Sequence, residues 1–137
     1  MSYQGFDFYS GEIVSEIENS TLVGSVYDYA ATQFESYPAV VVTSTDLAGE
    51  FADTSRNKDS FSFNILCLAD RLNKEAEVES TMRKLVDDIV TRLNNNSTIN
   101  ANANTYGKPV NIKWGYATAP DPDMRVAAIT YQIEVGQ

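Results

Sequence analysis

The side chains that could carry out chemistry are few in this chain. Its 137 residues contain no histidine and a single cysteine, Cys67. Without histidine, one chain cannot form a Ser-His-Asp or Cys-His catalytic group, a histidine-ligated zinc site or a histidine-based pH switch. Cys67 lies in an alternating segment beside Ile65, where a cysteine usually serves as a small buried hydrophobe. Carboxylate chemistry and oxygen-ligand metal sites remain open, because the chain has 19 acidic residues.

Two pairs of aspartates are candidates for such chemistry, and each has a simpler structural explanation. Asp87 and Asp88 fall within a helical repeat, where opposite charges four residues apart form a solvated face. Asp121 and Asp123 stand beside prolines, in a stretch that lacks the further oxygen ligands, the glycine and the final glutamate of an EF-hand loop. The expected charge pairs of the helix are Glu79–Arg83, Arg83–Asp87, Lys84–Asp88 and Asp88–Arg92.

Composition and motifs exclude several further classes of protein. No phosphate-binding loop, dinucleotide-binding motif or nucleophile elbow is present, so we predict no enzyme, no cofactor and no metal. The formal net charge of −9 argues against a general DNA-binding surface, since phosphate contacts need clustered lysine and arginine. Neither a long apolar run nor a signal peptide is visible. We therefore predict one domain, residues 1–137, that is made in a cytoplasm and has no membrane partner.

Two helices are predicted from apolar repeats. Ser10 is a typical N-cap for the first helix, whose buried face should carry Tyr9, Ile13 and Ile17 and which should end near residue 19 or 20. Asn73 should cap the second helix, which runs to about residue 94. The apolar stripe of this second helix comprises Val78, Met82, Leu85, Val86, Ile89, Val90 and Leu93.

Five segments have the apolar patterns of strands. Residues 26–29 suit a short edge strand, and residues 39–42 are apolar without alternation, which favours a central strand covered on both faces. Residues 60–67 alternate between apolar and polar side chains, so one face should pack on a core and the other should be polar. Residues 110–116 and 127–135 also alternate and should form an antiparallel pair at the C-terminal end.

The stretch that most strongly indicates partner binding is residues 44–59. We predict a long polar loop here, and loops of this length are commonly functional, although a mobile solvated loop is an equal interpretation. The polar side of the next predicted strand, residues 60–67, would face solvent in a monomer. In an oligomer it would face a neighbouring subunit or a lumen. The candidate protein-interface residues are Asp46, Glu50, Phe51, Asp53, Arg56, Lys58, Ser60, Ser62 and Asn64.

Together these elements predict an α+β fold. The order is helix, short strand, strand, loop, strand, long helix and two strands. We predict two layers, which are a mainly antiparallel sheet of four to five strands and both helices on one of its faces. This packing buries the apolar faces of both helices.

Several patches of the chain resemble the tail terminator (tail completion) proteins of long-tailed bacteriophages. The patches are residues 37–44 (YPAVVVTS), an acidic loop with residues 54–57 (TSRN), residues 61–65 (FSFNI), 82–89 (MRKLVDDI) and 114–116 (WGY), and the closing strand. With the first helix included, the resemblance covers most of the chain. It rests on these patches rather than on an invariant motif, so no individual binding residue carries over from the family.

The resemblance implies a structural role in a virion. Members of that family are small α+β domains without catalysis, and they form a hexameric ring on the finished tail tube. The ring stops polymerisation of the major tail tube protein and presents a surface that docks to the head-tail connector proteins. The implied location is the tail or neck, after assembly in the host cytoplasm. Genomic DNA would pass through the lumen without specific binding, and an acidic lumen would repel its phosphates.

Three other interpretations stay open from the sequence. Another phage neck component, such as a head-tail connector or stopper, would also be a ring of small domains. A small carboxylate-based enzyme or ligand-binding domain would need a deep pocket with convergent acids. A monomeric adaptor domain would remain a single chain in solution.

Overall fold

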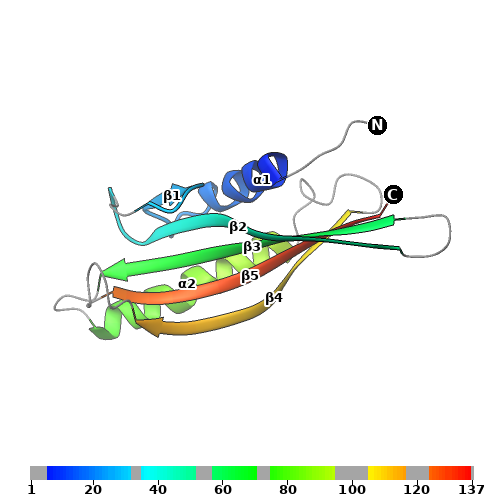
Figure 1. Ribbon diagram of the computed structural model, residues 1–137. Coiled ribbons are helices and arrows are strands. Elements are labelled where there is room, and N and C mark those ends of the chain that lie inside the picture. The colour runs from blue at the N-terminus through cyan, green and yellow to red at the C-terminus, as the bar shows by residue number, and fades with distance from the viewer. Residues whose placement is uncertain are drawn as a thin grey trace.

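The fold is that of a computed structural model, which describes residues 6–31, 35–51, 57–70, 75–94, 105–116 and 124–136. Two helices and five strands follow one another along the chain (Figure 1). In order they are α1 (Phe6–Glu18), β1 (Ser25–Tyr27), β2 (Ala39–Phe51), β3 (Asn57–Asp70), α2 (Glu75–Asn94), β4 (Thr105–Tyr116) and β5 (Met124–Gly136).

The five strands form one mixed sheet in the order β1-β2-β3-β5-β4. β1 runs parallel to β2, and the other neighbouring pairs are antiparallel. The last strand of the chain is therefore inserted between β3 and β4, so that β4 becomes one edge of the sheet and the short β1 becomes the other (Figure 1). The predicted α+β class and the edge position of the first strand are confirmed.

The main core lies between the sheet and the two helices. It forms because every second side chain of β3 and β5 points to the face that carries α1 and α2, and the helices present apolar stripes to that face. Ala39 and the three valines that follow it are buried, as their unbroken apolar run indicates. The buried strand residues of this core are Val40, Val42, Phe61, Phe63, Ile65, Cys67, Ala69, Ala127, Ile129, Tyr131 and Ile133.

The first helix begins one turn earlier than its sequence indicates. Ser10 lies inside α1 rather than at its N-cap, because the helix starts at Phe6. The physical reason is tertiary packing: the Phe6 ring lies edge-on to Phe61, with centroids 5.0 Å apart, and Tyr9 lies 5.1 Å from the same ring. The buried face formed by Tyr9, Ile13 and Ile17 is as predicted.

The predicted loop at residues 44–59 is mostly strand. β2 continues to Phe51 and β3 begins at Asn57, and their register resumes after an irregularity between Ser44 and Asp46. β5 pairs with the other side of β3 as far as Lys58, so this part of the hairpin belongs to a three-stranded region. The prediction was wrong because backbone pairing does not require apolar side chains, and the long-range partner β5 is invisible to local composition.

The second helix ends at Asn94, as predicted, while Asn73 lies outside the described residues. Two of the four expected charge pairs form: the Glu79 and Arg83 side chains approach to 3.6 Å, and those of Asp88 and Arg92 to 3.0 Å. Arg83–Asp87 and Lys84–Asp88 do not pair in this described helix. The two acids that do pair also bind groups outside the helix, since the Ser20 hydroxyl donates to Asp88 and Arg125 donates to Glu79.

Asp88 therefore joins α2 to the segment that follows α1, and its removal should have a pH-dependent effect. The hydrogen bond from Ser20 lowers the pKa of Asp88 most, partial burial opposes this, and Arg92 lowers it further. A lowered folded-state pKa stabilises the fold above the unfolded value of about 3.9, and this stabilisation is lost as the pH falls through the folded value. We expect Asp88→Asn to lower the free energy of unfolding by about 1–2 kcal/mol at pH 7.

That loss should shrink as the pH is lowered below about 4, where the wild-type carboxyl also becomes protonated. Urea unfolding of both proteins at several pH values measures the difference. The control is Asp87→Asn, because Asp87 is exposed on the same helix and should change stability by less than about 0.5 kcal/mol at every pH. A loss for Asp88→Asn that stayed constant down to low pH would contradict the assigned charge interaction.

Candidate interaction surfaces

The interface residues predicted from the sequence do not form a single exposed loop. Ser62 and Asn64 are half-buried on the sheet face opposite the helices, where β5 places Gln132 and Thr130 beside them. Ser60 lies on this same face but is only 8% exposed, so it offers little surface to a partner. Asp46, Glu50, Phe51 and Lys58 are strand residues of the β2–β3 hairpin, and Asp53 and Arg56 lie outside the described residues.

The sheet face opposite the helices, which we call the open face, is polar only over part of its length. Beyond Asn64 it carries a second, smaller hydrophobic cluster built on Val41, Leu68 and Met124. Tyr27, Leu66 and Val126 pack against this cluster. The predicted polar face is thus confirmed for Ser60 to Asn64. Leu66 and Leu68 follow at the same alternating positions, so the open face is apolar beyond Asn64.

The β4 edge carries exposed apolar side chains that sequence reasoning did not single out as a surface. Val110 is 48% exposed, Ile112 37% and Trp114 40%. Ile112 stands opposite Ile129, and Trp114 stands opposite Ala127, which places both on the side of the sheet that carries the helices. Their alternation is the signal of a core strand, but at the edge of the sheet these positions extend beyond the buried core.

Arg125 fixes the geometry of this edge. Its Nε donates to Glu79 Oε1 at 2.8 Å, and its Nη1 donates to the Gly115 carbonyl at 2.8 Å. The guanidinium carbon also lies 4.9 Å from the centroid of the Trp114 ring, which is cation–π geometry. These contacts join α2, β5 and β4 through one side chain, which is only 12% exposed. They therefore hold Trp114 in one position at the surface.

The opposite edge of the sheet, at β1, is held by backbone contacts of the chain that leads into β2. The Gly24 N–H donates to the Pro38 carbonyl at 2.8 Å, and the Glu35 N–H donates to the Tyr27 hydroxyl at 2.8 Å. A Cβ atom at position 24 would lie 2.8 Å from the backbone carbon of Tyr37, so the close approach of the two segments requires glycine. These contacts therefore fix the position of β1 relative to the segment that leads into β2.

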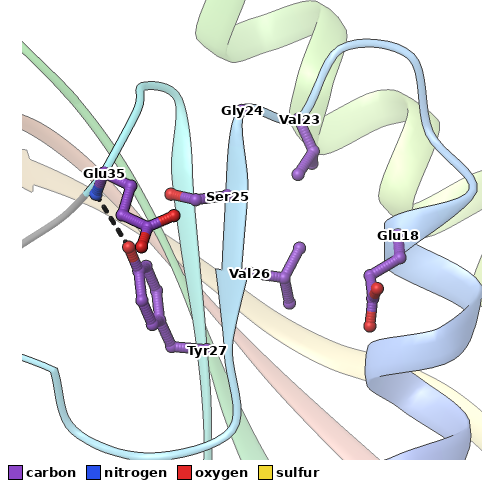
Figure 2. A pocket seen from close by; sticks show the side chains of 7 residues that line it. All are labelled: Glu18, Val23, Gly24, Ser25, Val26, Tyr27 and Glu35. Carbon is purple, nitrogen blue, oxygen red and sulfur yellow. Dashed lines mark hydrogen bonds between the residues drawn. The ribbon is translucent and has the colours of Figure 1, made fainter.

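An open pocket of about 380 Å³ lies along β1. Figure 2 shows that Val26 points toward Glu18 on α1, whereas Tyr27 and Glu35 lie on the other side of the strand. The lining of the pocket thus combines two valines with two carboxylates. Its lining residues are Glu18, Val23, Gly24, Ser25, Val26, Tyr27 and Glu35.

The single cysteine of the chain belongs to the main core. Burial raises the pKa of the Cys67 thiol to about 12, so it is a core side chain and not a nucleophile at neutral pH. No group of three or more potential metal ligands occurs in the described parts of the chain. Among the same residues, no helix combines the length and the apolar character needed to cross a membrane.

Comparison with known proteins gives a structural match. No family model matches the chain, and no curated protein matches it in sequence. Its fold is similar to that of a chain from the virion of a native gene transfer agent particle, with a TM-score of 0.59 and 16% sequence identity. The similarity covers 93% of this chain and 94% of the other, so the two share one fold over nearly their whole lengths.

Proposed function

We propose that this protein is a structural component of a phage-like virion that forms a ring on the end of the tail tube. The ring ends polymerisation of the tail tube protein and provides the surface to which the head docks. The observation that carries the proposal is the shared fold over 93% of the chain with a component of a gene transfer agent virion. The resemblance of its sequence patches to tail terminator proteins supports the same role.

The described surfaces agree with a ring. A head-to-tail ring needs two different, complementary patches on each subunit. The sheet offers them at its two edges, one with exposed apolar side chains on β4 and one with a pocket along β1. The role needs no cofactor, and it places the protein in the neck of the particle after assembly in the host cytoplasm.

The test is a tail-tube polymerisation assay with the purified protein and its cognate tube protein. We expect substoichiometric amounts to stop tube growth and to remain at one end of each tube, as seen by electron microscopy. We also propose that the β2–β3 hairpin contacts the tube, so Glu50→Lys should weaken this capping while the mass of the ring stays unchanged. Tubes that grow to unlimited length in the presence of the wild-type protein would contradict the proposed function.

A second candidate is another ring of the neck, such as a connector or stopper. The shared fold supports it equally, because the matching chain belongs to a virion particle as a whole. Mixing the protein separately with tail tubes and with portal complexes distinguishes the two roles. Binding to portal complexes with no effect on tubes would favour the connector.

A further inference from the structure

The exposed apolar side chains of this protein gather at the two edges of the sheet. Among the described residues seven large apolar side chains are exposed, and only Phe8 lies away from the edges. Those on or beside the β1 edge are Leu22, Tyr29 and Tyr37, and those on β4 are Val110, Ile112 and Trp114. A long strand with an open edge and apolar side chains is a template for association, and β4 is such a strand.

The two edges also carry opposite charge. The first 55 residues of the chain contain nine acidic and no basic residues, so they account for the whole formal charge of −9. The fold places exposed acids from this part, Glu18, Asp28 and Glu35, at the β1 edge. β4 contains no acidic residue, and its Lys108 and Lys113 are exposed without an ion-pair partner in the described structure. The edges are thus electrostatically complementary and lie on opposite sides of the sheet (Figure 1).

The two lysines and Glu35 lie on matching faces. Lys113 stands opposite Ala128, and Lys108 opposite Gln132, which places both lysines on the open face. Tyr27 stands opposite Val41 on that same face, and its hydroxyl holds the backbone of Glu35 there. If two copies meet edge to edge with their open faces aligned, the lysines of one copy approach the acids of the other.

The apolar groups match on the other side of the sheet. Ile112 and Trp114 lie on the side of the helices. Val23 and Val26 pack on that same side at the β1 edge, where they line the pocket of about 380 Å³. In the same edge-to-edge arrangement, the apolar side chains of β4 would enter this pocket on the helix side, while Glu35 on the other side of β1 would lie beside the lysines.

We infer that the β4 edge of one subunit docks against the β1 edge of a second copy of this chain. Ile112 and Trp114 occupy the pocket at Val23 and Val26, and Lys108 and Lys113 pair with Asp28 and Glu35. The contact joins two different patches, so repetition gives a head-to-tail assembly rather than a closed dimer, and this assembly is a ring where the rotation between subunits closes. This assignment rests on the proposed ring and specifies which surfaces build it.

Charge reversal tests the assignment. One variant carries Lys108→Glu with Lys113→Glu, and a second carries Asp28→Lys with Glu35→Lys. At low salt, each alone should associate at least tenfold more weakly than the wild type, because like charges meet at every contact. An equimolar mixture of the two should recover assembly with alternating subunits, and so should a chain that carries all four changes. Sedimentation of the particles, with and without tail tubes, measures the mass.

The matched control for the lysine variant is Arg83→Glu with Lys84→Glu, which makes the same change in net charge on the exposed face of α2. It should assemble like the wild type, and circular dichroism checks that every variant is folded. The assignment alone would be overturned if both charge-reversal variants formed rings as readily as the wild type. It would also be overturned if a mixture of the two variants failed to recover assembly. A wild-type protein that never associates, even on tubes, would overturn the proposed function as well.

Discussion

Phe61→Ala is expected to lower the free energy of unfolding by about 3–5 kcal/mol, a large part of the roughly 5–15 kcal/mol that stabilises a typical domain. Phe61 is fully buried on β3, where its ring contacts both Phe6 at 5.0 Å and Tyr9 at 5.1 Å. The truncation therefore removes buried apolar area and also the surface on which α1 packs. A cavity forms unless the helix shifts to fill it, and either outcome is costly.

Urea unfolding at one fixed protein concentration measures this loss, because association would itself add stability. Phe8→Ala is the matched control, since Phe8 lies on the same helix as Phe6 but is exposed. It should cost less than about 1 kcal/mol. Near-equal losses in the two variants would show that α1 does not pack on β3 as described.

Gly107→Ala is expected to destabilise the fold by about 1–3 kcal/mol, an unusually large effect for one added methyl group. A Cβ atom at this position would overlap the Tyr131 hydroxyl and lie 2.8 Å from Cζ of the same ring. Tyr131 is fully buried, so the ring has no free space into which it can turn. The added methyl group must displace core side chains or open the contact between β4 and β5.

Gly115→Ala is the matched control in the same strand, because nothing lies within 4 Å of its added Cβ. It should have little effect in the same unfolding assay. The double variant Gly107→Ala with Tyr131→Phe should recover part of the loss, since it removes the overlapping oxygen. Tyr131→Phe alone should be neutral or slightly stabilising, because the buried hydroxyl has no hydrogen-bond partner in the described structure. If the change in the free energy of unfolding of the double variant equalled the sum of the two single changes, the direct contact between the two residues would be contradicted.

Local periodicity in the sequence was sufficient to identify the core. Tyr9, Ile13 and Ile17 recur once per helical turn, and Phe61 and Phe63 recur at the strand period, so each segment alone indicates which face is buried. The same reasoning failed where the outcome depended on distant partners. Ser10 resembled an N-cap, but the helix begins earlier because Phe6 packs on β3.

The candidate surface was predicted only in part, for a similar reason. The polar side chains Ser62 and Asn64 are where alternation placed them, but polar composition did not distinguish a loop from the paired strands around Glu50 and Lys58. Exposure of Trp114 could not be read from the sequence either. An alternating strand has the same pattern in the middle of a sheet and at its edge, and only the order of the strands decides between the two.

The sequence by itself determined that this protein has no histidine chemistry, that it forms an α+β domain, and that all of its net charge lies in its first 55 residues. Only the tertiary structure decided where that charge would act. It did so by inserting β5 between β3 and β4 and by pairing β1 with β2, which leaves an acidic edge and a lysine-bearing edge on opposite sides of one sheet. Strand order results from burial and pairing over long sequence distances, and local residue patterns do not encode it.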